Sequence, residues 1–237
     1  MATDIGRLGV WSFIDNLSAP EAAAFAQQLE AWGYSALWIP EAVNRDPFAI
    51  IGYLAAKTSK LILATGIANI YARDPMTMKA IRKTLAELAP GRIVIGLGVS
   101  HSHLVHNVRG HEYSNKPVST MRAYLEGMEK ALYMGKEPAE EAPVVLAALR
   151  QNMLKLAAEK THGAHPYFVT PEHTARARHD GAGCLAVPRA DGAAGDRPGE
   201  GTRGRAQEHG YLPGAAQLPE QPARVRLRQR GLRRRRQ

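Results

Sequence analysis

Short apolar runs alternate with stretches of helical hydrophobic spacing along the first 178 residues. Six runs have the length and near-continuous apolar character of buried strands: Gly9–Ile14, Ala36–Ile39, Leu61–Gly66, Ile93–Leu97, Val144–Leu146 and Gly163–Phe168. Strands of parallel sheets are buried on both faces, so they read as apolar runs separated by helices. The pattern therefore predicts an α/β fold with a parallel sheet.

The intervening stretches carry the start and stop signals of helices. The first helix is expected to begin at a capping box of Ser18 and Glu21 and to end at Gly33. Five more are expected at Phe48–Ala56, from Pro75 to Pro90-Gly91, at about Val118–Tyr133, around Met153–Ala158 and from Thr170-Pro171. Six such units without a dinucleotide fingerprint favour an incomplete (β/α)8 TIM barrel of about six βα units; a doubly wound sheet is the alternative.

The composition changes abruptly after residue 178. The last 59 residues hold 12 Arg, 10 Gly, 9 Ala and 5 Pro, and they contain no Lys, Ile, Asn, Ser, Met, Phe or Trp. This segment also carries two thirds of the formal net charge of +9. So few large apolar side chains cannot offset the entropy of ordering the segment. We therefore predict two parts: a barrel portion, 1–178, and an irregular, disordered tail, 179–237.

The tail has two interpretations. A basic low-complexity tail would bind polyanions, such as nucleic acids, without sequence specificity and with an affinity that falls steeply with salt. Alternatively, the reading frame slips near Arg178, because out-of-frame translation of a GC-rich gene favours the codons of Arg, Gly, Ala and Pro. We favour the frame slip, which translation of the DNA in another frame would test.

The rest of the composition narrows the class of protein. No apolar run approaches the ~20 residues of a membrane span, and the N-terminus lacks the pattern of a secretory signal. Cys184 is the only cysteine, which excludes an internal disulfide and a thiolate zinc cluster. We therefore expect a cytoplasmic protein without a membrane partner.

Candidate chemistry lies where strands run into the following helices, because reactive groups of a (β/α)8 barrel gather there. These positions are Asp15, Glu41, Ile67–Asn69, Ser100–His103 and Ala147–Arg150. Four histidines, at 101, 103, 106 and 111, lack a helical pair or a carboxylate motif, so no metal site is predicted. Gly96-Leu97-Gly98 lacks the third glycine of a dinucleotide turn and is interpreted as small residues at a tight strand end.

Eight short blocks follow one another in the chain: Leu37–Glu41, Thr65–Asn69, Arg73–Pro75, Gly96–His101, Arg109-Gly110, Lys116-Pro117, Met121–Leu125 and Tyr167–Thr174. As an ordered set they resemble the luciferase-like monooxygenase superfamily, and within it the actinobacterial oxidoreductases that depend on a deazaflavin (coenzyme F420). The resemblance covers about residues 6–178. It implies a (β/α)8 barrel that moves hydride between a deazaflavin and a small organic substrate. FMN is the alternative cofactor, and a homodimer is compatible with the resemblance.

The resemblance implies a ring site at the third strand. Gly66-Ile67 matches a bulge, often a non-proline cis peptide, on which the cofactor ring rests. Ala68 continues this segment, and Asn69 falls where a side chain hydrogen-bonds the polar edge of the ring. The competing interpretation is that Gly66 only ends a strand.

Two further strand ends are implicated by the same resemblance. Glu41 falls at the second-strand acid that contacts the cofactor, and it is a catalytic candidate; alternatively it caps the following loop. Ser100 and His101 fall at the fourth-strand segment that borders ring and substrate. His101 is a candidate general acid or substrate contact, because a histidine titrates near neutral pH. Its alternative is a hydrogen bond to a backbone group.

Ala147, Ala148 and Leu149, which lead into a helix, correspond to the site of the cofactor phosphate, where free backbone N–H groups attract an anion. The sequence departs from its relatives here, since Arg150-Gln151-Asn152 replaces their usual Gly-Pro-Lys. Arg150 is expected to supply a bidentate phosphate contact instead.

Two rival functions stay open. One is a polyanion-binding protein that acts through the arginine-rich tail, in particular through residues 224–236. The other is a non-functional, truncated enzyme. Cofactor binding and redox turnover distinguish the oxidoreductase from both.

Overall fold

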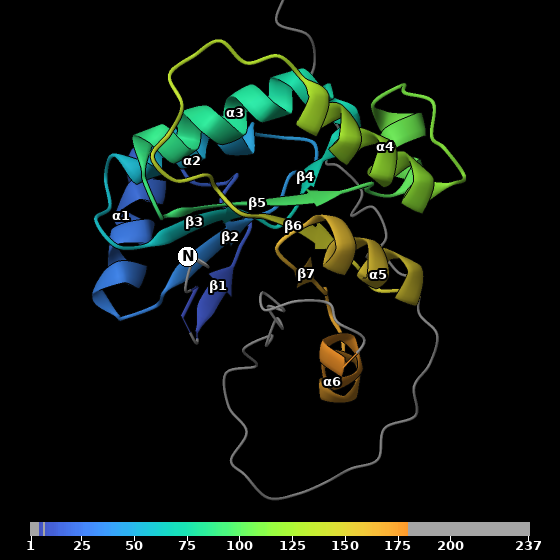
Figure 1. Ribbon diagram of the computed structural model, residues 1–237. Helices are drawn as coiled ribbons and strands as arrows, with labels where there is room; N and C mark the ends of the chain where they lie inside the picture. The colour runs from blue at the N-terminus through green and yellow to red at the C-terminus, as the bar shows by residue number, and fades with distance from the viewer. Residues whose placement is uncertain (1–4, 7, 180–237) are drawn as a thin grey trace, which may run out of the picture. The chain divides into compact units, whose positions relative to one another are not determined.

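The computed structural model describes residues 5–6 and 8–179, which lie in the first of two units of the chain, residues 1–192 and 193–237. A parallel sheet forms the centre of this unit (Figure 1). Its strands are β1 (Gly9–Trp11), β2 (Ala36–Ile39), β3 (Ile62–Thr65), β4 (Ala68–Asn69), β5 (Ile93–Gly98), β6 (Val144–Ala147) and β7 (Ala164–His165). The strand order is β1-β2-β3-β5-β6-β7, and β4 pairs with β5 beyond the end of β3. Except for His179, the predicted tail lies outside the described residues.

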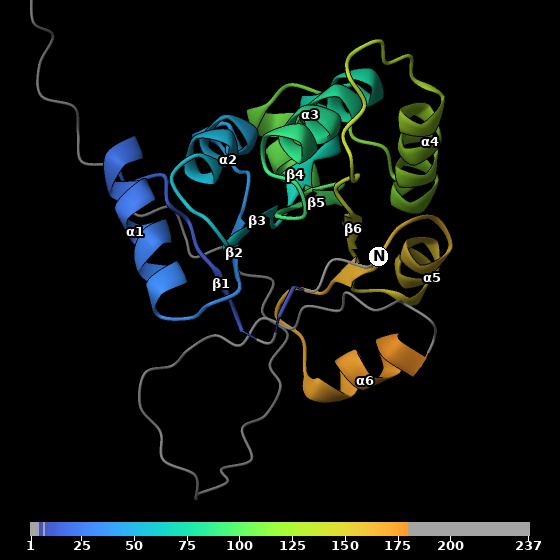
Figure 2. The ribbon, with the colours of Figure 1, turned by 60° about the vertical axis from the view of Figure 1, so that its left-hand side comes forward.

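A helix follows each strand of the main path. The helices are α1 (Ala19–Ala31), α2 (Pro47–Ala55), α3 (Pro75–Leu88), α4 (Pro117–Lys130), α5 (Gln151–Lys160) and α6 (Pro171–His179). A short 3₁₀ helix, η1 (Ile70–Ala72), precedes α3, and a π-helical turn, η2 (His103–Val108), precedes α4. Helices α1 to α5 follow one another around the outer face of the sheet (Figure 2). Six βα units of a TIM barrel are therefore confirmed. None of the helices described within residues 5–179 is long and apolar enough to cross a membrane.

Side-chain caps set the starts of α1, α2 and α3. Ser18 and Glu21 form the predicted reciprocal capping box of α1, and Gly33 follows that helix with a φ of +82°. Asp46 and Asp74 cap α2 and α3 by accepting hydrogen bonds from backbone N–H groups of the first turn. These caps fix where each loop at the carboxyl end of a strand becomes a helix.

Alternation along the strands divides the apolar core between two faces of the sheet. In β2, Leu37 and Ile39 belong to the large cluster that the helices share. Ala36 and Trp38 point to the other face, since successive side chains of a strand alternate. The smaller cluster there consists of Ala36, Trp38, Ile62, Ala64, Val94 and Val145, with Ile5 and Trp11 packed against it. This inner cluster corresponds to the interior of a barrel.

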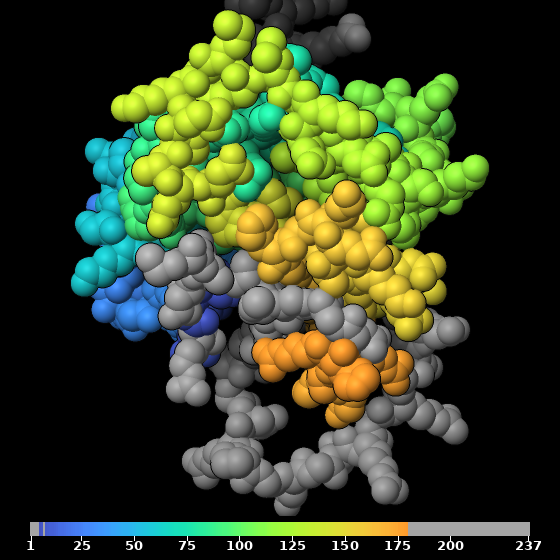
Figure 3. All heavy atoms as spheres, viewed as in Figure 1, coloured from blue at the N-terminus to red at the C-terminus, as the bar shows by residue number. Residues whose placement is uncertain are grey.

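The 131–143 segment between α4 and β6 passes over α3 at the surface of the molecule (Figure 3). Charged contacts hold it there. Lys83, of which only 7% of the side chain is exposed, pairs with Glu137 and Glu141. Arg82 donates to the Ala142 carbonyl at 2.6 Å. The connection to β6 is thus fixed by ion pairs more than by apolar packing.

Two predicted elements differ in extent. The sixth strand, expected over Gly163–Phe168, is only Ala164–His165, because Pro166 has no N–H to donate to a neighbouring strand. The helix expected to reach Tyr133 ends at Lys130, since Ala131 has an extended backbone. Leu132, which lies within the expected helix but beyond the observed one, is 68% exposed.

Glycines in β5 permit a close approach to the chain that follows β3. A Cβ on Gly96 would lie 2.0 Å from the Thr65 carbonyl oxygen, and a Cβ on Gly98 would lie 2.5 Å from Ile67 Cδ1. The buried Thr65 hydroxyl also donates to the Gly96 carbonyl at 2.7 Å and accepts from the Gly96 N–H at 2.9 Å. The interpretation of Gly96-Leu97-Gly98 as small residues at a tight strand end is confirmed.

We expect Gly96→Ala to lower the free energy of unfolding by more than about 2 kcal/mol, because the new methyl group would overlap backbone that cannot move freely. Denaturation in urea, followed by circular dichroism, measures this. Gly52→Ala is the matched control, since its Cβ would lie 3.7 Å from Leu85 in ordinary contact, within helix α2. Equal stability of Gly96→Ala and the parent would show that β3 and β5 do not approach this closely.

Candidate functional site

The segment between β3 and β4 forms a bulge at the carboxyl end of the sheet. The peptide bond between Gly66 and Ile67 is cis, where the resemblance implied it. The Gly66 N–H donates to the Ile39 carbonyl at 2.8 Å, and the Glu41 N–H donates to the Ile67 carbonyl at 3.1 Å. The Trp11 indole N–H donates to the Gly66 carbonyl at 2.6 Å. Hydrogen bonds from β1 and from the end of β2 therefore fix the bulge.

Residues of four strands, β1, β2, β5 and β6, lie around the bulge. A Cβ on Gly66 would lie 2.9 Å from the Trp11 ring and 3.2 Å from Trp38, so these two tryptophans cover that glycine. The Ile67 side chain extends over Gly98, which also adjoins Ala147 at the end of β6. The structure thus brings together Gly66, Ile67 and Ala147, three residues of the predicted ring and phosphate sites.

Asn69 is fully buried and only partly paired. Its backbone N–H donates to Glu41 Oε2 at 2.8 Å, and its Oδ1 accepts from the Tyr71 N–H at 3.0 Å, which caps η1. Its Nδ2 has no hydrogen-bond partner within residues 5–6 and 8–179. Buried donors are nearly always paired in native proteins. A buried, unpaired amide donor is therefore available at the position where the resemblance implied a contact with the cofactor ring.

The Glu41 carboxylate lies at the centre of a network of ion pairs. Its side chain is 5% exposed, and Arg73 Nη1 lies 3.0 Å from both carboxylate oxygens. Arg109 Nη2 lies 3.5 Å from Oε1 and donates to the Ala42 carbonyl at 2.6 Å. Glu41 thus links the segments that follow β2, β4 and β5. Whether it also contacts a cofactor stays a prediction.

Arg73 extends this network to the start of α2. It pairs with Asp46, the N-cap of that helix, and its guanidinium lies 4.7 Å from the centre of the Phe48 ring. Burial opposes ionisation of Asp46, but hydrogen bonds from the Ala49 N–H and from Arg73 outweigh it and hold the pKa of Asp46 below its usual range. Arg73 and Arg109 lie in two of the blocks that carry the family resemblance, which implied no role for either residue.

The segment after β5 carries the predicted Ser100 and His101. Ser100 has a φ of +58°, and His101 is exposed. His103 Nδ1 bonds to the Asn107 amide at 3.0 Å, and His106 Nδ1 lies 3.3 Å from the His111 carbonyl. Within residues 5–6 and 8–179, no three His, Cys, Asp or Glu side chains converge on a metal position.

The predicted phosphate site lies at the start of α5. Ala148 is buried, Leu149 is 52% exposed, and Arg150 occupies the N-cap without a side-chain hydrogen bond to the helix. The Arg150 side chain therefore does not cap the first turn of α5, although the Arg150 carbonyl accepts from the Met153 N–H at 3.0 Å. His173 of α6 bonds to the Leu149 carbonyl at 2.7 Å and ties α6 to this turn.

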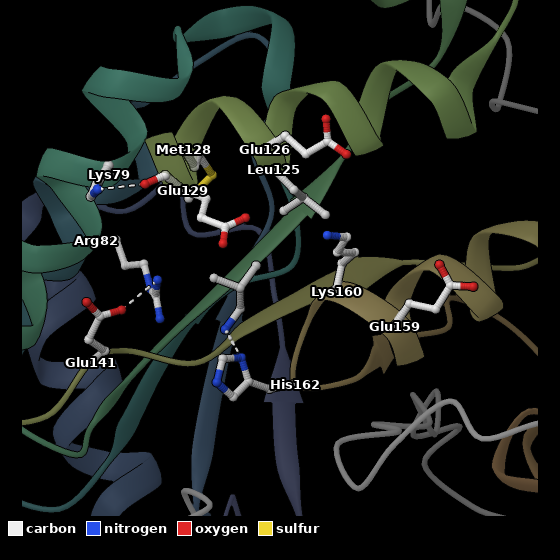
Figure 4. Close-up of a pocket in the computed structure, with 11 residues that line it drawn as sticks. Lys79, Arg82, Leu125, Glu126, Met128, Glu129, Glu141, Glu159, Lys160 and His162 are labelled. Atoms are coloured by element: carbon white, nitrogen blue, oxygen red, sulfur yellow. Dashed lines mark hydrogen bonds and ion pairs between the residues drawn. The ribbon is translucent and has the colours of Figure 1, made fainter. Parts of the chain in front are cut away.

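A cavity of about 490 Å³ lies elsewhere, between α3, α4, α5 and β6 (Figure 4). Its lining mixes charges of both signs, from Lys79, Arg82, Glu126, Glu129, Glu141, Glu159 and Lys160, with the imidazole of His162. It opens at the amino ends of β6 and β7, whereas the predicted site residues follow the carboxyl ends of the strands. Because reactive groups of TIM barrels lie at the carboxyl ends, we place the candidate site at the bulge.

The chain belongs to the luciferase-like monooxygenase family, whose model matches residues 7–187. Among its relatives is a protein of Mycobacterium tuberculosis, provisionally named as a coenzyme F420-dependent oxidoreductase, which is 26% identical over 195 residues. The match covers 70% of this chain and 55% of that relative. A 5,10-methylenetetrahydromethanopterin reductase of Methanolobus tindarius is 25% identical over 167 residues, which cover 64% of this chain and 51% of the reductase. The chain thus spans about half the length of these relatives.

Solved structures share the fold. An F420-dependent secondary alcohol dehydrogenase, in complex with an F420-acetone adduct, superposes with a TM-score of 0.66 at 16% identity over 74% of this chain and 63% of the dehydrogenase. A Baeyer-Villiger monooxygenase component from Pseudomonas putida, in complex with FMN, gives a TM-score of 0.59 at 15% identity over 73% and 60% of the two chains. The luciferase-like TIM-barrel fold is therefore confirmed.

His162 bonds to the first residue of β6, and this contact is expected to make the stability of the chain sensitive to pH. Its Nδ1 accepts from the Val144 N–H at 3.1 Å, which a protonated imidazole cannot do. Burial and the neighbouring Arg82 lower the pKa of His162 below its ordinary value of 6.5. The folded state therefore binds this proton less readily than the unfolded chain, and the contribution of His162 is lost as the pH falls through 6.5.

We expect the free energy of unfolding of the parent to fall more steeply between about pH 7.5 and 5.5 than that of His162→Asn, since Asn keeps an acceptor near Nδ1 but does not titrate. Urea denaturation at several pH values measures the difference. Parallel pH curves for the two proteins would show that His162 is protonated equally in both states.

Proposed function

We propose that this chain binds coenzyme F420 at the Gly66-Ile67 bulge, and that the barrel to which it belongs transfers hydride between this cofactor and a small organic substrate. The observation that carries the proposal is the buried Asn69 Nδ2, which has no hydrogen-bond partner among the residues that the structure describes. An oxygen on the polar edge of a deazaflavin would satisfy this donor. Relatives named for coenzyme F420 support the choice of cofactor.

The residues of the bulge fit a planar ring. Ile67 is partly exposed at the end of the sheet, and the buried Ala68 and Asn69 follow it directly. The indole of Trp11 lies beside the bulge, so a bound ring would meet it. When bound, the deazaflavin supplies the carbon centre that accepts or gives up hydride, while the protein orients it and excludes water.

The start of α5 fits the phosphate end of the cofactor. Its uncapped N–H groups and helix dipole attract an anion. Ala147 and Ala148, which have short side chains, lead from β6 toward this helix start, and Leu149 beside them is 52% exposed. Arg150, at the N-cap, would add a charged contact where the resemblance implied a glycine.

The substrate would lie toward the segment that follows β5. Ser100 leaves the strand with a positive φ, and His101 is exposed to solvent. We assign His101 to the substrate side of the site, where its imidazole would serve as a general acid or a substrate contact.

FMN is the second candidate, because a protein of the same fold was solved with FMN bound. We expect parallel titrations of the full chain with coenzyme F420 and FMN, followed by tryptophan quenching, to give the smaller Kd for coenzyme F420. A smaller Kd for FMN would favour the second candidate. Saturable binding of neither compound would contradict the proposed function.

Asn69 variants test the ring contact. Asn69→Ala and Asn69→Ser both remove the Nδ2 donor, but serine retains an oxygen that can cap η1. If Nδ2 binds the ring, both variants should weaken cofactor binding about tenfold, or ~1–3 kcal/mol, in the same titration. Full affinity in Asn69→Ser combined with a loss in Asn69→Ala would show that Asn69 acts only as a cap.

Arg150 tests the phosphate contact. We expect Arg150→Ala to weaken FMN binding about tenfold and to leave riboflavin binding unchanged, because riboflavin lacks the phosphate. Arg122→Ala is the control, since Arg122 pairs with Glu159 on the exposed side of α4. An equal loss of affinity for both ligands in Arg150→Ala would contradict a phosphate contact.

A further inference from the structure

The segment 101–112, which carries four histidines, is joined to the rest of the protein by a charged side chain at its end. Arg109 follows η2 directly, and its Nη2 donates to the Ala42 carbonyl at 2.6 Å. The same nitrogen lies 3.5 Å from Glu41 Oε1. These contacts connect the segment after β5 to the one after β2.

The segment itself is weakly buried. Val105 is its fully buried residue, whereas His101, His103 and His106 are exposed. The side-chain hydrogen bonds of His103 and His106 stay within the segment. Burial of one valine gives a loop of this length little stability of its own. The position of the histidines therefore depends on contacts such as that of Arg109.

We propose that Arg109 is a positioning residue, which acts through Glu41 and Ala42 to hold the histidine-bearing segment beside the candidate site. This inference rests on the proposed function for its role in catalysis, because His101 lies at the start of the segment. Glu41 then serves as the fixed anchor of two loops, since its carboxylate already accepts from Arg73 and from the Asn69 N–H.

The arrangement of charges around Glu41 should allow Arg109 to be replaced without unfolding the protein. Removing one partner of a buried ion pair is costly when it leaves the other partner unpaired. Glu41 would not be left unpaired by loss of Arg109, because Arg73 contacts both of its oxygens at 3.0 Å. Loss of Arg109 should therefore release the segment while β2 and the bulge keep their structure.

Hydrogen–deuterium exchange of the full chain without ligand tests this directly. The amides of Val105, Arg109, Gly110 and His111 all donate within the segment. In Arg109→Met we expect residues 101–112 to exchange at least about tenfold faster than in the parent, with α4 and β5 unchanged. Arg109→Lys keeps the attraction to Glu41 but not the simultaneous contact with Glu41 and the Ala42 carbonyl. The exchange rate of the segment in this variant should lie between those of the parent and Arg109→Met.

Arg122→Met is the matched control, because it removes an ion pair with Glu159 that is 40% and 56% exposed. It should leave exchange in 101–112 as in the parent. Equal exchange of this segment in the parent and Arg109→Met would overturn the proposal. Faster exchange throughout the chain would also overturn it, since Arg109 would then support the fold as a whole.

A second measurement separates this inference from the proposed function. With coenzyme F420 bound, we expect Arg109→Met to change the Kd less than threefold but to raise iodide quenching of the bound deazaflavin, because the segment no longer shields it. Unchanged quenching in a variant with a loosened segment would contradict shielding of the site. If the parent binds no cofactor, the proposed function fails, while the exchange experiment still decides whether Arg109 positions the segment.

Discussion

The close approach of β3 and β5 is the contact on which the candidate site depends. Gly96 has no side chain, so the Thr65 carbonyl lies where a Cβ would be, and the Thr65 hydroxyl bonds to both polar groups of the Gly96 backbone. The chain can then leave β3, turn at the bulge and pair with β5 a second time, as strand β4. This return buries Asn69 and leaves its amide donor without a partner in the described part of the chain.

Ion pairs fix the loops around that bulge, whereas apolar packing stabilises the sheet. The segments after β2, β4 and β5 meet at the Glu41 carboxylate through Arg73 and Arg109. A buried carboxylate is expensive unless it is paired and hydrogen-bonded, so the three segments are specified jointly. The same need for partners leaves Glu41 few free lone pairs, which favours an anchoring role over proton transfer.

The sequence predicts the sheet and the helix starts closely, because strand burial and helix capping are local patterns. The capping box at Ser18 and the strand Ala36–Ile39 are confirmed as predicted. Contacts between distant segments are not encoded in periodicity, so the sequence did not predict the pairing of Glu41 with Arg109. The short β7 follows from Pro166, whose effect an apolar run conceals. The roles of Glu41, Ser100, His101 and Arg150 stay predictions.

The most direct test is a crystal structure of the full chain with bound coenzyme F420 or FMN. The account predicts that the ring contacts the Gly66-Ile67 bulge, with a ring oxygen within hydrogen-bond distance of Asn69 Nδ2 and the phosphate at the start of α5. A ring bound instead in the cavity between α3, α4 and α5, or a bulge site from which Asn69 Nδ2 points away, would contradict it.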